Sequence, residues 1–344
     1  MGSVLTDLGL TVPVLAAPMA GGPSTTALVT AAARAGSLGF LPAGYQTAQA
    51  FAEQIGVVRH EGVIFGVNLF APNPVPVDVA AFRRYAAEIQ PEADAYGIDL
   101  AGSDPVEDDD SWRDKLDVLL GEPVPVVSFT FGIPEPTVIA ALRRAGSVVI
   151  QTVTSAGEAQ AAAAAGVDAL AVQGSVAGGH SGTLTPERPP APTPTVELVA
   201  QVRQAVALPL VAAGGLATPG QVGAVLRAGA EAAMVGTALL RTPESGASAA
   251  HQAALADPLR GETVVTRAFT GRPARALPNR FVERHDGTAP LGYPAVHHLT
   301  SALRRAAVAA GDTEGFNMWA GVGYRYSTTD PAGQVLVSLS ADAR

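Results

Sequence analysis

The chain has 344 residues, of which 48% are hydrophobic and 15% are charged, and its formal net charge is −9. A chain this long and apolar can bury a large core, which excludes an intrinsically disordered protein, and its acidic balance argues against a nucleic-acid partner, because phosphate contacts need clustered Lys and Arg. It contains no cysteine, so disulfides, thiolate chemistry and cysteine-ligated metals are excluded.

The chain also lacks the sequence features of export and membrane insertion. Its N-terminus has no basic region followed by an apolar core, and no apolar run reaches about 18 residues without Gly, Pro or a charge. We therefore expect a cytoplasmic protein without a membrane span.

A short pattern recurs along the first three quarters of the chain. An Ala-rich stretch ends in glycine and is followed by an apolar run at Ala33–Gly36, Leu142–Gly146, Ala163–Gly166 and Leu226–Gly229. Glycine in this place ends a helix, and the apolar run that follows is typical of a buried strand. The repeat therefore indicates successive helix-to-strand connections in a parallel sheet.

Eight apolar segments are candidate strands, and a helix fits between most of them. The candidate strands are Val14–Met19, Leu38–Gly44, Phe65–Phe70, Val124–Phe131, Ser147–Val153, Ala169–Gln173, Leu210–Gly214 and Ala232–Leu239. Residues suited to cap the helix starts are Ser24, Thr47, Asp78, Ser155, Thr195 and Thr218, the last followed by Pro219. Eight parallel strands with helical crossovers favour a (β/α)8 TIM barrel over an open doubly wound sheet.

The predicted barrel is interrupted once and then extended. Residues 1–240 form the barrel core, with an insertion at about 78–121, which is longer than an ordinary crossover. Residues 241–344 are predicted to supply the last barrel helix and a C-terminal lid or extension that does not fold separately. An Ala-rich helix is expected there at Ser301–Ala310.

Two polar segments outside the strand ends invite a metal interpretation. The acidic run from Asp104 to Asp110 lacks the alternating oxygen ligands and the glycine turn of a calcium-binding loop. We expect a solvated first turn of a helix at Trp112–Leu120 instead. The adjacent His297 and His298 would face different ways on a helix or a strand, so we expect no metal site.

Glycines mark the predicted ends of the last two strands. In (β/α)8 barrels the active site lies at the carboxyl ends of the strands. Gly214 and Gly215 lead into the helix that begins near Thr218, while Gly236 and Thr237 follow the eighth strand. Exposed backbone N–H groups at these places would form an anion cradle, which predicts a phosphate. The alternative is that the glycines only relieve crowding at the rim.

Two amides stand at other strand ends. Asn68 ends the third strand and Gln173 the sixth, and each amide offers two donors and an acceptor. Amides suit the edge of a heterocycle such as the pyrimidine of a flavin, although either could be a buried amide satisfied by protein. Together with the cradle they indicate a phosphorylated heterocyclic cofactor. The G-x-G-x-x-G and P-loop fingerprints are absent, which disfavours dinucleotide and nucleoside triphosphate sites of those types.

A glycine-rich loop with one histidine follows the sixth strand. The segment Gln173–Gly182 contains four glycines and His180, its single proton-transfer group. Taken alone, this segment fits an active site and a flexible turn equally well.

These segments together resemble the class I nitronate monooxygenases, formerly called 2-nitropropane dioxygenases, which are FMN-dependent (β/α)8 flavoproteins. The resemblance runs nearly end to end, and the loop Gln173–Gly182 is its most specific element. Its other segments are Ala17–Gly22, Ala35–Phe40, Gly66–Phe70, Ser128–Gly132, Ala213–Gly215, Val235–Thr237, His297–Thr300 and Asn317–Gly321. The loop departs from the family at Ser175 and Val176, where an acidic residue is frequent.

The resemblance implies that His180 is the catalytic histidine and faces an FMN held at the strand ends. The expected cofactor residues, with the cradle included, are Met19, Gly21, Asn68, Gln173, Gly178, Gly214, Gly215, Met234, Val235, Gly236 and Thr237. The implied reaction is oxidation of alkyl nitronates, such as propionate 3-nitronate, by O₂ to a carbonyl compound and nitrite. His180 would take the α-proton of a neutral nitroalkane or, when protonated, orient the anionic nitronate, since an imidazole with a pKa near neutrality suits either task.

Two other functions stay open from the sequence. One is an NAD(P)H:quinone or enoyl-thioester reductase on the same flavin barrel, and the other is a non-catalytic flavin-binding barrel. The expected partners are a small-molecule nitronate and O₂, without nucleic acid or membrane. The sequence leaves the physiological substrate and the formation of a homodimer open.

Overall fold

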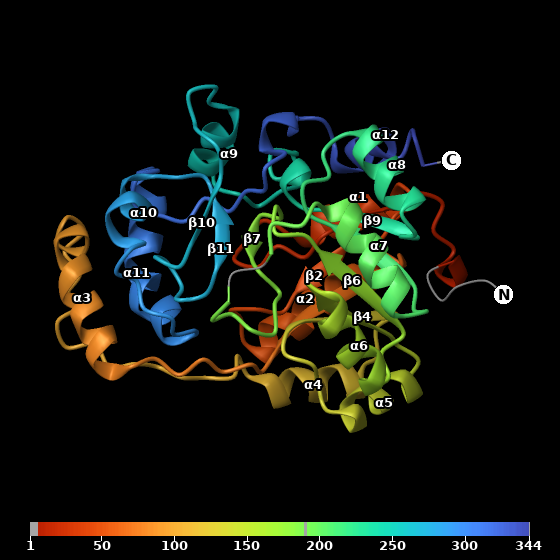
Figure 1. The fold of residues 1–344 in the computed structure, drawn as a ribbon, viewed down its shortest axis with the longest axis horizontal. Coiled ribbons are helices and arrows are strands. Elements are labelled where there is room, and N and C mark those ends of the chain that lie inside the picture. Colours follow the sequence, from red (N-terminus) through yellow and green to blue (C-terminus); the bar gives the residue numbers. More distant parts are fainter. Residues whose placement is uncertain (1–5, 189–190, 344) are drawn as a thin grey trace.

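Eight parallel strands form a closed barrel (Figure 1). The computed structural model describes residues 6–188 and 191–343. The barrel strands are β1 (Val14–Ala16), β2 (Phe40–Pro42), β3 (Gly66–Ala71), β4 (Val126–Phe131), β5 (Val148–Val153), β6 (Ala169–Gln173), β8 (Leu210–Ala213) and β9 (Ala232–Val235). Their order is β1-β9-β8-β6-β5-β4-β3-β2, and a parallel bridge between Ala16 and Gly39 closes the ring. The predicted TIM barrel is confirmed.

Helices cover the outside of the barrel and continue into a second lobe. The helices are α1 (Thr26–Arg34), α2 (Ala48–His60), α3 (Val79–Asp94), α4 (Trp112–Gly121), α5 (Pro136–Arg144), α6 (Ala156–Ala165), α7 (Thr195–Ala205), α8 (Pro219–Arg227), α9 (Ala249–Ala256), α10 (Arg280–His285), α11 (Ala295–Ala310) and α12 (Ala332–Leu339). Short 3₁₀ helices are η1 (Thr6–Leu8), η2 (Thr237–Leu239) and η3 (Tyr324–Tyr326). Within the described ranges, no helix is long and apolar enough to cross a membrane.

Four of the predicted helix caps are confirmed and two are displaced by one residue. The side chains of Thr47, Asp78, Ser155 and Thr218 each accept a backbone N–H in the first turn. Thr25, not Ser24, caps α1, because the Ser24 hydroxyl is engaged with the backbone of Met19 and Ala17. Thr195 is the first residue of α7, and its hydroxyl donates to the carbonyl of Gly214. Both displaced residues therefore fix the loops that follow β1 and β8.

Several strand and helix boundaries also differ from the prediction, and the two largest differences lie at the eighth strand and at α11. The eighth strand ends at Val235 instead of Leu239, because the chain turns at Gly236 into η2. Helix α11 begins at Ala295, earlier than the predicted Ser301, because Pro294 occupies its N-cap position.

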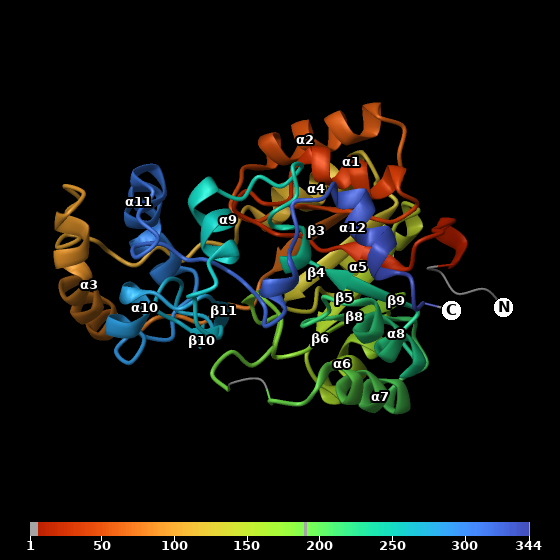
Figure 2. The same cartoon turned by 90° about the horizontal axis from the view of Figure 1, so that it is seen from above.

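The second lobe joins segments that are far apart in sequence. Helix α3, from the insertion after β3, lies beside α11 in both views (Figures 1 and 2). An apolar cluster separate from that of the barrel is built from residues between Val77 and Leu100 and between Ala268 and Leu303. The chain then returns to the barrel, where α12 packs against α1. The lobe thus combines the insertion after β3 with the part of the chain between β9 and α12, the last barrel helix.

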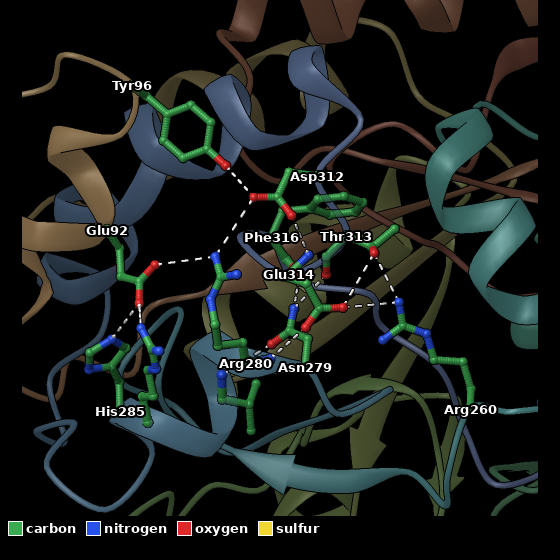
Figure 3. A network of polar contacts seen from close by, with 12 residues as sticks. Glu92, Tyr96, Arg260, Asn279, Arg280, His285, Asp312, Thr313, Glu314 and Phe316 are labelled. Atoms are coloured by element: carbon green, nitrogen blue, oxygen red, sulfur yellow. Dashed lines mark hydrogen bonds and ion pairs between the residues drawn. The ribbon is translucent and has the colours of Figure 1, made fainter.

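A polar network fastens α3 to this lobe (Figure 3). The carboxylate of Glu92 in α3 forms ion pairs with Arg284, at 2.9 Å, and with Arg280, at 3.5 Å, both in α10. The hydroxyl of Tyr96 donates to Asp312 at 2.6 Å. These contacts join residues separated by about 200 positions, so the insertion and the C-terminal region depend on one another for their packing.

The acidic run is mostly exposed, as expected, but some of its carboxylates have protein partners: Glu107 accepts the N–H of Val77, and Asp108 lies 2.9 Å from His298. Asp104 and Glu107 to Asp109 are exposed, but Asp110 is partly buried and lies 2.8 Å from the ammonium group of Lys115, which is only 1% exposed. The other carboxylate oxygen of Asp110 accepts the backbone N–H of Tyr45 at 3.0 Å. The turn at Asp110, with φ of 56°, directs this side chain inward and makes it a support for the end of β2.

A short second sheet connects the barrel loop to the lobe. The hairpin strands β10 (Val264–Thr266) and β11 (Ala274–Ala276) are antiparallel, and β11 also pairs with β7 (Gly179–His180). His180 lies opposite Ala274 in this sheet. The glycine-rich loop is therefore held by strand pairing, and the flexible-turn interpretation is wrong.

Candidate active site

The predicted cofactor residues lie around one end of the barrel, since the carboxyl ends of all eight parallel strands face the same way. Met234 points into the barrel and belongs to its interior apolar cluster, whereas Val235 packs outward against the helices. Val235 can therefore serve a ligand only through its backbone. The sulfur of Met19 lies beside Gly236, at 3.3 Å from where a Cβ would stand, and Gly21 faces open space with φ of 83°.

The glycines after β8 and β9 provide unpaired backbone donors. Gly214 and Gly215 have φ of 103° and 72°, which L side chains rarely adopt. The backbone N–H groups of Gly215 and Thr237 donate to no acceptor among the residues that the structure describes. The hydroxyl of Thr237 accepts the N–H of Gly321 at 2.9 Å and fixes that loop beside the cradle. Such donors suit a phosphate.

The two predicted amides have different surroundings. The Gln173 amide donates to the carbonyl of His180 at 3.2 Å and accepts the N–H of Gly182 at 2.7 Å, so it clamps its own loop. The Nδ2 group of Asn68 donates to Ser128 and Thr130 at 2.9 and 3.1 Å. The Oδ1 atom of Asn68 accepts no hydrogen bond from the described part of the chain. Asn68 therefore keeps its oxygen as an acceptor for a ligand, whereas Gln173 uses its oxygen and one N–H within its own loop and keeps a second N–H.

The loop after Gln173 is covered by a segment from the C-terminal region. A Cβ on Gly178 would lie 2.5 Å from the nitrogen of Gly321, so only glycine permits this approach. The carbonyl of Val176 accepts the N–H of Val322 at 3.2 Å, and the carbonyl of Ser175 accepts the Nε of Arg275 at 3.0 Å. The two residues that depart from the family pattern thus fix the loop through their backbone.

The loop also borders a partly open cavity. A cavity of about 130 Å³ lies between the loop and the hairpin β10–β11. Gln173, Ser175 and His180 line it from the loop, and Val265 and Arg275 line it from the hairpin.

His180 is surrounded by aromatic rings. The ring centroids of Phe131 and Tyr293 lie 5.8 Å from that of His180, and the centroid of Trp319 lies at 5.3 Å. The Nε2 atom of His180 lies 2.9 Å from the hydroxyl of Thr270. His180 is partly buried as a residue.

Two of the residues around His180 have strained backbones. Tyr45, after β2, has φ of 67°, and Phe131, at the end of β4, has φ of 83°. The N–H bond to Asp110 holds Tyr45, whose ring stacks on His297 with the centroids 4.1 Å apart. The hydroxyl of Tyr293 donates to that of Tyr45 at 3.3 Å. Strain of this kind is tolerated where the surroundings enforce it, which is common at functional sites.

Two arginines add positive charge to the site. Arg272 is fully buried, with its guanidinium 4.0 Å from the centroid of Phe131. It donates to the carbonyls of Ser181 and Thr183, while its Nη1 has no partner in the described chain. Arg304, on α11, donates to Thr300, Asn317 and His297. Burial lowers the pKa of each arginine to about 10, so both are cationic at neutral pH.

The surroundings keep the imidazole of His180 neutral. Burial lowers its pKa to about 3, and the charges of Arg272 and Arg304 act in the same direction. The expected pKa near neutrality is therefore wrong for the chain by itself, because the sequence shows neither the burial of His180 nor the two nearby arginines. Burial raises the pKa of Tyr45 to about 12 and also raises that of Tyr293, so both phenols are neutral donors.

The residues that were absent from the predicted site include four polar side chains. Tyr45, Arg272, Tyr293 and Arg304 come from four segments that meet only in the folded chain. Tyr45 follows Gly44 at the end of the second predicted strand, and this position is the one sequence signal that could have identified it. In the described residues, no group of three or more His, Asp and Glu side chains could hold a metal ion.

Comparison with known proteins agrees with this geometry. The sequence model of the family described as "Nitronate monooxygenase" matches residues 2–342. A probable nitronate monooxygenase of Staphylococcus aureus (strain JH9) is 36% identical over 337 residues, covering 96% of this chain and 94% of the relative.

Two solved structures share the fold along nearly the whole chain. The nitroalkane oxidase from Streptomyces ansochromogenes is 50% identical with a TM-score of 0.94, covering 99% of this chain and 97% of that one. FabK from Thermotoga maritima is 26% identical with a TM-score of 0.76, covering 99% and 96%. The chain belongs to the nitronate monooxygenase family of flavin-dependent oxidoreductases.

Proposed function

We propose that this enzyme uses FMN to oxidise alkyl nitronates, such as propionate 3-nitronate, with O₂ to a carbonyl compound and nitrite, and that it also accepts neutral nitroalkanes. The observation that carries the proposal is the positive charge beside His180. Arg272 and Arg304 form no ion pair with any described carboxylate, and their charges both act on His180. Cations held in this way without a counter-ion favour an anionic ligand, and a nitronate is an anion.

The strand ends fit the proposed FMN. The free N–H groups of Gly215 and Thr237 suit its phosphate, and the free Oδ1 of Asn68 suits an N–H of its ring. Further proposed contacts are Met19, Gly21, Gln173, Gly178, Gly214, Met234, Val235 and Gly236. When bound, the flavin takes electrons from the substrate and passes them to O₂.

The side chains around His180 have separable tasks in this proposal. His180, neutral at physiological pH, accepts the α-proton of a nitroalkane. The charges of Arg272 and Arg304 stabilise the anion that remains. Since Tyr293 donates to Tyr45, the hydroxyl hydrogen of Tyr45 is free for a substrate oxygen. The rings of Phe131 and Trp319 limit the access of water.

The test compares a nitroalkane with its nitronate in one enzyme. We expect His180→Ala to lower nitrite release from a nitroalkane by about 10²- to 10⁴-fold, the usual contribution of a general base, and to affect the preformed nitronate much less. His60→Ala is the matched control, because His60 is exposed at the end of α2. Equal nitroalkane rates in wild type and His180→Ala would contradict the assignment.

A reductase on the same scaffold is the competing activity. Rapid reduction of the flavin by NADH or NADPH in stopped-flow measurements, without nitrite release from nitronates, would replace the proposed reaction. We further propose a cytoplasmic enzyme that acts on small molecules, and light scattering will decide whether it forms a homodimer.

A further inference from the structure

The hydrogen-bond partner of His180 determines which imidazole nitrogen carries a proton and which one can accept a proton. Thr270 is 1% exposed, and its Oγ1 lies 2.9 Å from Nε2 of His180 and 3.3 Å from the carbonyl oxygen of Arg272. Pairing of β7 with β11 and the bond from the N–H of Ser181 to the carbonyl of Pro273, at 2.9 Å, hold the two segments in register. The contact is therefore fixed by the backbone on both sides.

The single hydrogen of the threonine hydroxyl decides the direction of these bonds. The carbonyl of Arg272 can only accept, and in the described residues Thr270 is its one donor. If Thr270 instead donated to His180, this buried carbonyl would be left without a partner, which is unfavourable. The hydroxyl therefore donates to Arg272 and accepts from His180, which places a proton on Nε2.

We propose that Thr270 is a positioning residue that holds His180 as the Nε2–H tautomer, so that Nδ1 is the atom that removes the substrate proton. Nδ1 forms no hydrogen bond within the described part of the chain, and its lone pair is free. The proton-transfer part of this inference rests on the proposed function, whereas the tautomer does not.

The step balances without a further reactant. The α-C–H bond of the nitroalkane breaks, its proton moves to Nδ1, and the electron pair forms the C=N bond of the nitronate with the negative charge on the nitro oxygens. The imidazolium that forms keeps its Nε2–H bond to Thr270, and the bond from Thr270 to the carbonyl of Arg272 supports it. The charges of Arg272 and Arg304, which both act on His180, favour the new anion.

Kinetics of two variants separate this role from a structural one. Thr270→Val keeps the shape and removes the hydroxyl, and Thr270→Ser keeps the hydroxyl. We expect Thr270→Val to lower kcat/KM for a nitroalkane by roughly tenfold or more, because a wrong tautomer disables the base. Oxidation of the preformed nitronate should stay within about twofold, because it needs no base, and Thr270→Ser should restore the nitroalkane rate. An equal loss with both substrates would overturn the proposal.

Nitrogen NMR of histidine in the intact holoenzyme tests the tautomer directly. With ¹⁵N-labelled histidine, and His180→Gln to assign the signal, the wild type should show a protonated Nε2 and an unprotonated Nδ1. Thr270→Val should shift the signal toward a mixture. A wild-type signal with the proton on Nδ1 would overturn the inference. If the wild type releases nitrite from neither substrate, the proposed function fails, while the NMR result still decides the tautomer.

Discussion

Arg272 combines a buried charge with incomplete pairing. Its side chain is fully buried between the face of Phe131 and two backbone carbonyls, and its Nη1 has no partner in the described ranges. A buried guanidinium is costly unless its donors are satisfied, so this geometry is best completed by an anion. Burial is the main cause that keeps the imidazole of His180 neutral, and the charge of Arg272 acts in the same direction. One residue thus favours both the anionic product and the basic form of the histidine.

The anion-binding role of Arg272 can be measured. We expect Arg272→Gln to raise KM for a nitronate by about 10- to 100-fold, because a hydrogen bond to a charged group contributes about 1.5–3 kcal/mol. Arg305→Gln on α11 is the control, since Arg305 is exposed and donates to Ser301. Steady-state nitrite release gives both constants. An unchanged KM in Arg272→Gln would show that the anion binds elsewhere.

At the scale of elements, the site depends on a close backbone contact between two loops. The loop after β6 and the segment before η3 approach through the backbones of Gly178 and Gly321. The N–H of Gly321 also donates to Thr237 in η2, so the same contact continues to the phosphate cradle. The C-terminal region therefore completes the rim of the barrel instead of merely lying over it.

A methyl group at this contact should separate the loops. In Gly178→Ala the new Cβ would lie 2.5 Å from the nitrogen of Gly321, so one loop must move, and we expect weaker FMN binding and lower activity. Gly220→Ala on α8 is the matched control, because its Cβ would meet nothing within 4 Å. The flavin absorption of each purified variant, titrated with FMN, gives the affinity. Equal affinities would contradict the importance of this contact.

At the scale of the whole molecule, the two lobes are built from alternating segments of the chain. The second lobe takes α3 from the insertion, and the chain returns from it to supply α12 against α1. We propose that the C-terminal extension does not fold separately, because its packing needs α3 from the insertion and its last helix, α12, packs against α1 of the barrel. It also contains buried histidines, His251 and His297, whose pKa values are lowered mainly by burial, that of His251 to about 4.

Acid should therefore destabilise the whole protein. Between the unfolded histidine pKa of about 6.5 and the lower folded pKa, the unfolded state binds more protons, so stability is lost as pH falls. From pH 7 to pH 5, we expect each of the two histidines to reduce the free energy of unfolding by about 2 kcal/mol. Urea unfolding followed by tryptophan fluorescence measures the loss, and His251→Leu should remove about 2 kcal/mol of it. An unchanged pH dependence in His251→Leu would contradict this explanation.

The sequence by itself determined the barrel, its eight strands, the family and the identity of the loop that carries His180. Local patterns predicted the barrel: apolar runs of strand length, glycines that end helices, and hydroxyl or carboxylate caps such as Thr47 and Thr218. The resemblance of short motifs indicated the family and the loop. Local patterns depend on neighbours in the chain, so they can be interpreted without the fold. The insertion was also recognised, but Asp110, the last residue of its acidic run, was not expected to support Tyr45.

Only the tertiary structure decided the surroundings of His180. Arg272, Tyr293 and Arg304 come from the second lobe and Tyr45 from the end of β2, so no local pattern links them to the histidine. The structure also showed that the two predicted amides differ. The oxygen of Asn68 is free to accept a hydrogen bond, whereas the amide of Gln173 is bonded within its own loop. Burial, charge proximity and the direction of a hydrogen bond depend on distances between remote segments, and folding alone sets those distances.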